Sequence, residues 1–212
     1  MPRRELFGLV TFFLIAFGIP WYGWAVIDDE TLSLWLFPLF CSIGGFCAAY
    51  VEGGTDGLRE FRRRTLRLRG ALKWIVLASV IPLALGLSYL LGSGVPLSSM
   101  RLSMEAMLGL TLAAALVTGP LAEEFGWRGY LQHKLLRHMR PIWVVLAVGA
   151  LWCAWHIPLF YSSVFSSPDS ALRFLVYVVT WTVFILYLVQ RANGSVWPAV
   201  FFHWGANTHA DV

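Results

Sequence analysis

The chain has 212 residues, of which 58% are hydrophobic and 13% are charged, with eleven tryptophans and a net charge of +4. Soluble proteins average about 25% charged residues, so this composition excludes an ordinary soluble domain and predicts an integral membrane protein. The three cysteines lie in apolar stretches without CxxC spacing, which argues against a disulfide framework or a thiolate metal site. The positive charge lies beside apolar segments and no nucleic-acid motif accompanies it, so we expect a lipid bilayer rather than nucleic acid as the partner.

The first half of the chain predicts three transmembrane helices. Apolar stretches long enough to cross a bilayer cover residues 6–27, 32–50 and 74–91. The first follows a basic terminus but is too long for the apolar part of a signal peptide, so we interpret it as a retained span. Gly44 and Gly45 in the second stretch favour close packing against another helix.

The second half predicts four more helices. They begin at about residue 102 and then cover residues 142–160, 172–189 and, as a short final segment, 196–207. We therefore expect an all-α polytopic fold of about seven transmembrane helices, forming a single membrane domain over residues 1–212. Such a bundle can enclose an intramembrane active site.

Basic residues set the expected orientation. Residues 59–73 carry seven arginines and lysines against a single acid, and residues 133–140 form a second basic cluster. Short basic loops remain cytoplasmic, so we expect both segments inside the cell and residues 28–30 and 162–170 outside. The compact set of spans, without a transit-like segment, predicts a bacterial inner membrane.

The residues around which the chain is organised follow the apolar run 104–117. Placing the charged side chains of Glu123, Glu124 and Arg128 at membrane depth costs about 2.5–3.5 kcal/mol of insertion free energy per charge. Charged residues at this depth are usually functional. Glu124 and Arg128 are four residues apart and can form an ion pair, which would be a purely structural role. Glu123 points about 100° away from Glu124 and needs a partner from another segment.

Two later helices add histidines. His156 precedes Pro158, which cannot donate a backbone hydrogen bond and loosens the helix there, although a lone histidine is more often a core residue. His203 and Asn207 are four residues apart and share one helix face. At about 1.5 Å per residue from the presumed cytoplasmic ends, Glu123, His156 and His203 fall in one layer of the membrane.

These side chains suit hydrolysis. Glu123 and a histidine can hold and deprotonate a water molecule, and Asn207 and His203 can donate hydrogen bonds to a developing oxyanion. Glu123, His156 and His203 are also an adequate zinc set, but the HExxH motif is absent and no local spacing enforces metal geometry. The residues leave the use of zinc open.

Three motifs occur in order, each within or at the end of an apolar helix: Glu123-Glu124-x-x-x-Arg128, Trp152-x-x-x-His156 and His203-x-x-x-Asn207. Together they resemble the CAAX-protease and bacteriocin-processing (CPBP, or Abi) family of intramembrane endopeptidases, over a core of about residues 104–209. The second motif of that family usually begins with Phe, so Trp152 is a departure that affects pocket shape more than chemistry. Glu124 and Arg128 would be supporting residues.

The resemblance implies a role for each remaining motif residue. Glu123 and His156 would activate water, and His203 and Asn207 would form the oxyanion site. The family also carries a metalloprotease label, and a metal would be held by Glu123, His156 and His203.

The sequence thus predicts an intramembrane endopeptidase, similar to CAAX-type prenyl proteases, acting on a membrane-associated peptide or protein. One alternative is an ion- or proton-coupled transporter or channel that uses the same charges as a relay, although we find neither internal repeats nor paired broken helices. The other is a non-catalytic membrane scaffold. Neither the substrate nor the oligomeric state follows from the sequence.

Overall fold

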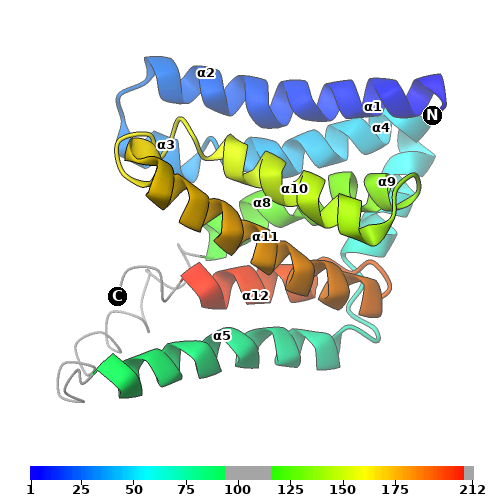
Figure 1. The fold of residues 1–212 in the computed structure, drawn as a ribbon. Helices are drawn as coiled ribbons and strands as arrows, with labels where there is room; N and C mark the ends of the chain where they lie inside the picture. Colours follow the sequence, from blue (N-terminus) through cyan, green and yellow to red (C-terminus); the bar gives the residue numbers. More distant parts are fainter. Residues whose placement is uncertain (94–115, 208–212) are drawn as a thin grey trace.

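The computed structural model describes residues 1–93 and 116–207, and the described part is helical without strands (Figure 1). The elements in chain order are α1 (Arg3–Phe13), η1 (Leu14–Gly18), α2 (Ile19–Val26), α3 (Glu30–Trp35), α4 (Leu39–Thr65), α5 (Leu72–Ser93), η2 (Val117–Leu121), α8 (Ala122–Glu124), η3 (Phe125–Gln132), α9 (His133–Leu136), α10 (Pro141–Trp155), η4 (Val164–Ser166), α11 (Pro168–Arg191) and α12 (Trp197–Asn207). The all-α class is therefore confirmed.

Three stretches are long and apolar enough to cross a membrane. They are Arg3–Val26, which joins α1, η1 and α2, then Leu32–Thr65, and Pro168–Arg191. They correspond to the first, second and sixth predicted spans. Leu72–Leu85 and Pro141–Trp155 are shorter apolar helices.

The seven predicted spans are not all confirmed. The fifth was expected over 142–160, but α10 ends at Trp155 and turns follow, where Pro158 cannot donate to a continuing helix. At about 1.5 Å per residue, this helix is shorter than a hydrocarbon core of about 30 Å. The final helix, α12, has 11 residues. Most of the apolar part of the predicted fourth span lies outside the described residues.

The basic stretch 59–73 is not a loop throughout, as the sequence analysis assumed. Helix α4 continues to Thr65 and carries the first four of its arginines. A kink at Gly54, whose φ of 61° costs little only for glycine, separates this basic part from the apolar part of α4. A short connection then leads to α5, which starts at Leu72.

The segment from α8 to α9 runs through the interior of the bundle, and α4, α10 and α11 all contact η3 (Figure 1). The predicted close packing at the paired glycines is confirmed. A Cβ on Gly45 would lie 3.1 Å from the Cα of Gly126, and a Cβ on Gly44 would lie 3.2 Å from the Phe12 carbonyl oxygen. All eight residues of η3 are buried, so this packing holds the first motif inside the protein.

Candidate active site

Both glutamates of the first motif sit in an unusual stretch of helix. Glu123 and Glu124 belong to α8, a three-residue α-helical step between the π-helical segments η2 and η3. π-Helical turns are rare and occur frequently at functional sites. The depth estimate from the sequence assumed an α-helix through Gly126 and Gly129. The helix is continuous there but has the wider π geometry.

Glu124 connects two of the three motifs. Its side chain and that of Arg128 are fully buried, and Arg128 Nη1 donates to Glu124 Oε1 at 2.9 Å, so the predicted ion pair is confirmed. His203 Nδ1 lies 2.8 Å from the same oxygen. Because an ionised carboxylate only accepts hydrogen bonds, Nδ1 is the donor and Nε2 faces away from Glu124. The sequence analysis did not predict this contact.

Glu123 finds its partner on α10, as its orientation required. The indole Nε1 of Trp152 donates to Glu123 Oε2 at 2.7 Å. Trp152 also lies under the Arg128 guanidinium, which is 4.1 Å from the ring centroid, and its ring centroid is 5.3 Å from that of His203. Trp152 is therefore a direct polar partner of the site, which the sequence analysis had treated only as a change of pocket shape.

Three of the four predicted catalytic side chains converge on Gly119. A Cβ at this glycine would lie 2.9 Å from Asn207 Nδ2, 3.6 Å from His203 Nε2 and 3.8 Å from Glu123 Oε1. The predicted common face of His203 and Asn207 is therefore directed toward Glu123. A side chain at Gly119 would collide with the Asn207 amide, so a glycine is needed for this approach, a role that no spacing in the sequence indicated.

His156 joins this group through Trp152. It caps the C-terminal end of α10, is 9% exposed, and its Nδ1 is 2.8 Å from the Trp152 carbonyl oxygen. Since a carbonyl only accepts, Nδ1 carries a proton, and in the neutral ring Nε2 keeps a lone pair for water. Stacking on Phe160, with ring centroids 5.4 Å apart, fixes the ring further. The hydrogen bond of His156 goes to the backbone rather than to Glu123.

A comparison of the sequence with known protein families gives a specific result. Residues 105–209 match the family model described as type II CAAX prenyl endopeptidase Rce1-like, a range that contains all three motifs. The chain belongs to this CAAX endopeptidase family. The predicted resemblance is thereby confirmed, and no curated protein matches the chain.

Membership in this protease family and the apolar helices together make the chain an integral membrane protein of the CAAX endopeptidase class. The family acts on membrane-associated substrates, in agreement with the coarse prediction from the sequence. Its hydrolytic character fits a site that combines a buried carboxylate with imidazole and amide groups.

The zinc set that the sequence allows in this CAAX-family protein is not assembled in the described residues. No group of three or more His, Cys, Asp or Glu side chains there is arranged to hold a metal ion. The contacts that the three candidate ligands make use Glu123 Oε2, His203 Nδ1 and His156 Nδ1, and within the described part of the chain they leave Glu123 Oε1 and the two Nε2 atoms unpaired.

Proposed function

We propose that this protein is an intramembrane endopeptidase that hydrolyses a peptide bond near the membrane-associated end of its substrate, in the manner of a CAAX-type prenyl protease. The convergence of Glu123, His203 and Asn207 on Gly119 carries the proposal. An ion relay would explain buried charges, but it gives no role to an amide directed at the same space as a carboxylate and an imidazole.

In the proposed mechanism, Glu123 Oε1 and His156 Nε2 hold a water molecule, and the carboxylate takes its proton as the oxygen attacks the substrate carbonyl carbon. Asn207 Nδ2 and a protonated His203 Nε2 donate to the resulting oxyanion. When the intermediate collapses, the C–N bond breaks and Glu123 returns the proton to the leaving amine. The atoms balance without a covalent enzyme intermediate.

Glu124 and Arg128 support the oxyanion site. The Glu124 carboxylate accepts a hydrogen bond from His203 Nδ1 at 2.8 Å, which orients the ring with Nε2 directed at Gly119. Arg128 holds the same carboxylate oxygen at 2.9 Å and so fixes its position. Trp152 keeps Glu123 Oε2 occupied, which leaves Oε1 for the water.

A cleavage assay tests this function. Purified protein reconstituted in vesicles is given a peptide that ends in a prenylated cysteine and three further residues, beside its unprenylated counterpart. We expect release of the C-terminal tripeptide from the prenylated peptide by the wild type, and release slower by about 10²–10⁴-fold by Glu123→Gln. Ion flux without cleavage would replace the endopeptidase with the relay.

We also propose that Glu123, rather than a metal ion, activates the water. The absence of a three-ligand group in the described residues supports this choice. Elemental analysis of the purified protein beside a chelator titration tests it. Stoichiometric zinc that is lost together with activity, and that His203→Ala no longer retains, would overturn it.

The orientation is a further part of the proposal. Residues 59–73 and 133–140 face the cytoplasm, with residues 28–30 and 162–170 on the other side of a bacterial inner membrane. Single cysteines introduced into the four segments, labelled from each side with an impermeant reagent, test this. Labelling of 59–73 from outside would reverse the orientation.

A further inference from the structure

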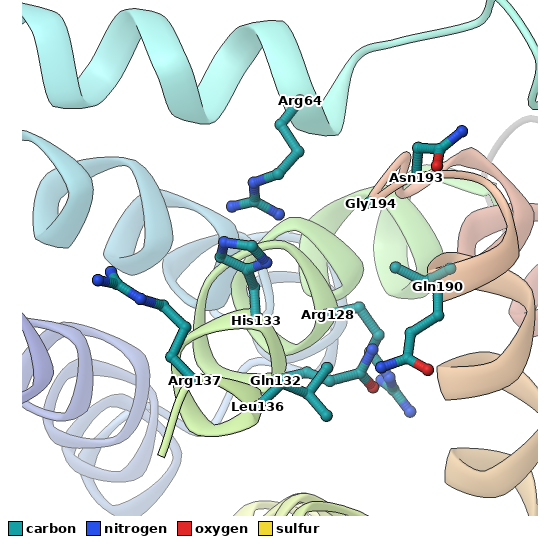
Figure 2. Close-up of a pocket in the computed structure, with 10 residues that line it drawn as sticks. Arg64, Arg128, Gln132, His133, Leu136, Arg137, Gln190, Asn193 and Gly194 are labelled. Atoms are coloured by element: carbon teal, nitrogen blue, oxygen red, sulfur yellow. The ribbon is translucent and has the colours of Figure 1, made fainter. Parts of the chain in front are cut away.

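A cavity of about 370 Å³ lies where several helices end (Figure 2). It is bounded by the end of α4, by η3 and α9, and by the end of α11 with the turn that follows. Its polar lining includes Arg64, Arg128, Gln132, Arg137 and Gln190. Three of its lining residues are arginines and none is acidic.

Two fully buried side chains in this wall lack hydrogen-bond partners. Arg128 uses Nη1 on Glu124, but its Nε and Nη2 have no partner, and neither amide atom of Gln132 has one. Both residues are 0% exposed, and Figure 2 shows them among the cavity residues, near Gln190. Buried donors without partners are costly and rare in native proteins, and these atoms have hydrogen-bonding capacity that no protein group uses.

Arg64 adds a cationic donor from the opposite wall. Its Nη2 donates to the Gly129 carbonyl oxygen at 2.8 Å, which fixes the guanidinium, while Nη1 is buried without a partner. Within the described residues Arg64 forms no ion pair, whereas Arg137 is paired with Glu5 at 3.0 Å. Arg64 Nη1 and the free nitrogens of Arg128 are therefore the cavity's uncompensated donors.

We propose that this cavity binds a phosphate group. Phosphate oxygens accept several hydrogen bonds at once and suit guanidinium donors that come from different elements. The Gln132 Oε1 acceptor needs a donor in the ligand, which a hydroxyl beside the phosphate supplies. Both a glycerol-phosphate lipid headgroup and free hydrogen phosphate have this chemistry.

The position of the cavity agrees with a headgroup ligand. It lies at the C-terminal ends of α4 and α11, whose last turns carry basic residues. Such pockets of basic residues at helix ends bind anionic headgroups in membrane proteins. The cavity shares Arg128 with the active site but contains neither Glu123 nor His203 nor Asn207, so the inference does not depend on the proposed hydrolysis.

The test uses delipidated full-length protein in a neutral maltoside detergent. Binding is followed by native mass spectrometry and thermal unfolding, with phosphatidylglycerol, phosphatidylcholine or inorganic phosphate added, and chloride at matched ionic strength as the blank. We expect phosphatidylglycerol to bind and to raise the unfolding temperature above that with phosphatidylcholine. Phosphatidylglycerol binding that inorganic phosphate displaces assigns the site to phosphate in general, and binding without displacement assigns it to the headgroup.

Two neighbouring arginines on α4 provide a matched pair of variants. Arg64→Gln should weaken phosphatidylglycerol binding by about tenfold or more, the value of one charge-assisted hydrogen bond. Arg63→Gln removes the same charge from an exposed side chain that pairs with Glu60, and should leave binding within about twofold.

Gln132→Leu removes the buried amide without changing charge, and should also weaken binding if the hydroxyl contact exists. This variant keeps the proposal testable if Arg64→Gln does not fold. Equal affinity of wild type, Arg64→Gln and Gln132→Leu, or no difference between phosphatidylglycerol, phosphatidylcholine and the chloride blank, would overturn the phosphate site.

Discussion

Two buried polar clusters lie along the stretch from α8 to α9, and they differ in what their side chains leave unused. The first, which we call the Glu124 cluster, comprises Glu123, Glu124, Arg128, Trp152 and His203. The second, the Glu52 cluster, comprises Glu5, Glu52, Tyr130, Lys134, Arg137 and His138. Both join distant segments by ion pairs and hydrogen bonds.

The Glu52 cluster is closed. Tyr130 donates to Glu52 Oε1 at 2.5 Å and Lys134 donates to Glu52 Oε2. Glu5 is 3.0 Å from Arg137 through one oxygen and 2.8 Å from His138 through the other. All four carboxylate oxygens have a partner, so this cluster can hold α1, α4 and α9 together through its own ion pairs and hydrogen bonds.

The Glu124 cluster is open. Glu123 Oε1, His203 Nε2 and Asn207 Nδ2 all face the space at Gly119. Ion pairs and hydrogen bonds are thus common to both clusters, and the difference between structure and chemistry lies in the unused acceptor and donor atoms that are directed at Gly119.

The largest expected contrast comes from the same substitution in each cluster. Glu123→Gln should lower kcat by about 10²–10⁴-fold, because the amide cannot take a proton from water, while its oxygen still accepts from Trp152 and preserves stability. Glu52→Gln should leave kcat per folded molecule unchanged and cost about 1–3 kcal/mol of stability, because Lys134 loses the nearer of its two charged partners and keeps only Glu5.

Peptide cleavage and thermal unfolding of both variants measure this contrast. If Glu52→Gln lost activity as severely as Glu123→Gln at equal folded fraction, the distinction between an open and a closed cluster would be wrong.

Removing Glu124 should affect both stability and activity. Glu124→Ala leaves Arg128 buried without an ion pair and His203 without its acceptor, and breaking a buried pair costs about 3–5 kcal/mol. Glu124→Gln keeps an acceptor and should recover part of the stability but little of the activity. Denaturant unfolding with parallel kinetics checks this, and a stable, fully active Glu124→Ala would remove Glu124 from the site.

Asn207 should matter for rate alone. Asn207→Ala removes one oxyanion donor and should cost about 2.7–4 kcal/mol of transition-state stabilisation, seen in kcat with little change in KM. Because the side chain is only partly buried, unfolding should hardly change. An effect confined to KM would assign Asn207 to substrate binding instead.

The smallest effect tests the departure from the family motif. Trp152→Phe keeps an aromatic ring under Arg128 but removes the indole donor to Glu123. A hydrogen bond to a charged group is worth about 1.5–3 kcal/mol, so kcat should fall by about 10–100-fold and its pH dependence should shift. Unchanged kinetics would make Trp152 a packing residue only.

The parts of this molecule that follow local rules were predictable. The lengths of the apolar stretches predicted the helices α1 to α2, α4 and α11. The separation of four residues predicted the ion pair between Glu124 and Arg128. The end of α10 at Trp155 was missed because hydropathy continues beyond the last helical residue.

The contacts that define the site come from tertiary structure, and sequence spacing could not predict them. His203 reaches Glu124 across 79 positions, and Trp152 reaches Glu123 across 29. The π-helical geometry around α8 has no local signature, and the importance of Gly119 depends on side chains from a later helix. A tryptophan where the family motif has Phe was the one available signal for a donor at Glu123, because indole carries an N–H that benzene lacks.

The central claim is that Glu123 activates a water molecule that attacks the peptide bond directly. Single-turnover cleavage in ¹⁸O-water, with mass spectrometry of peptide and protein, tests this most directly. We predict one ¹⁸O atom in the new carboxylate of the N-terminal product from the wild type, none in Glu123, and cleavage by Glu123→Gln that is slower by about 10²–10⁴-fold. Cleavage by Glu123→Gln at the wild-type rate, or ¹⁸O in the enzyme carboxylate instead of the product, would contradict it.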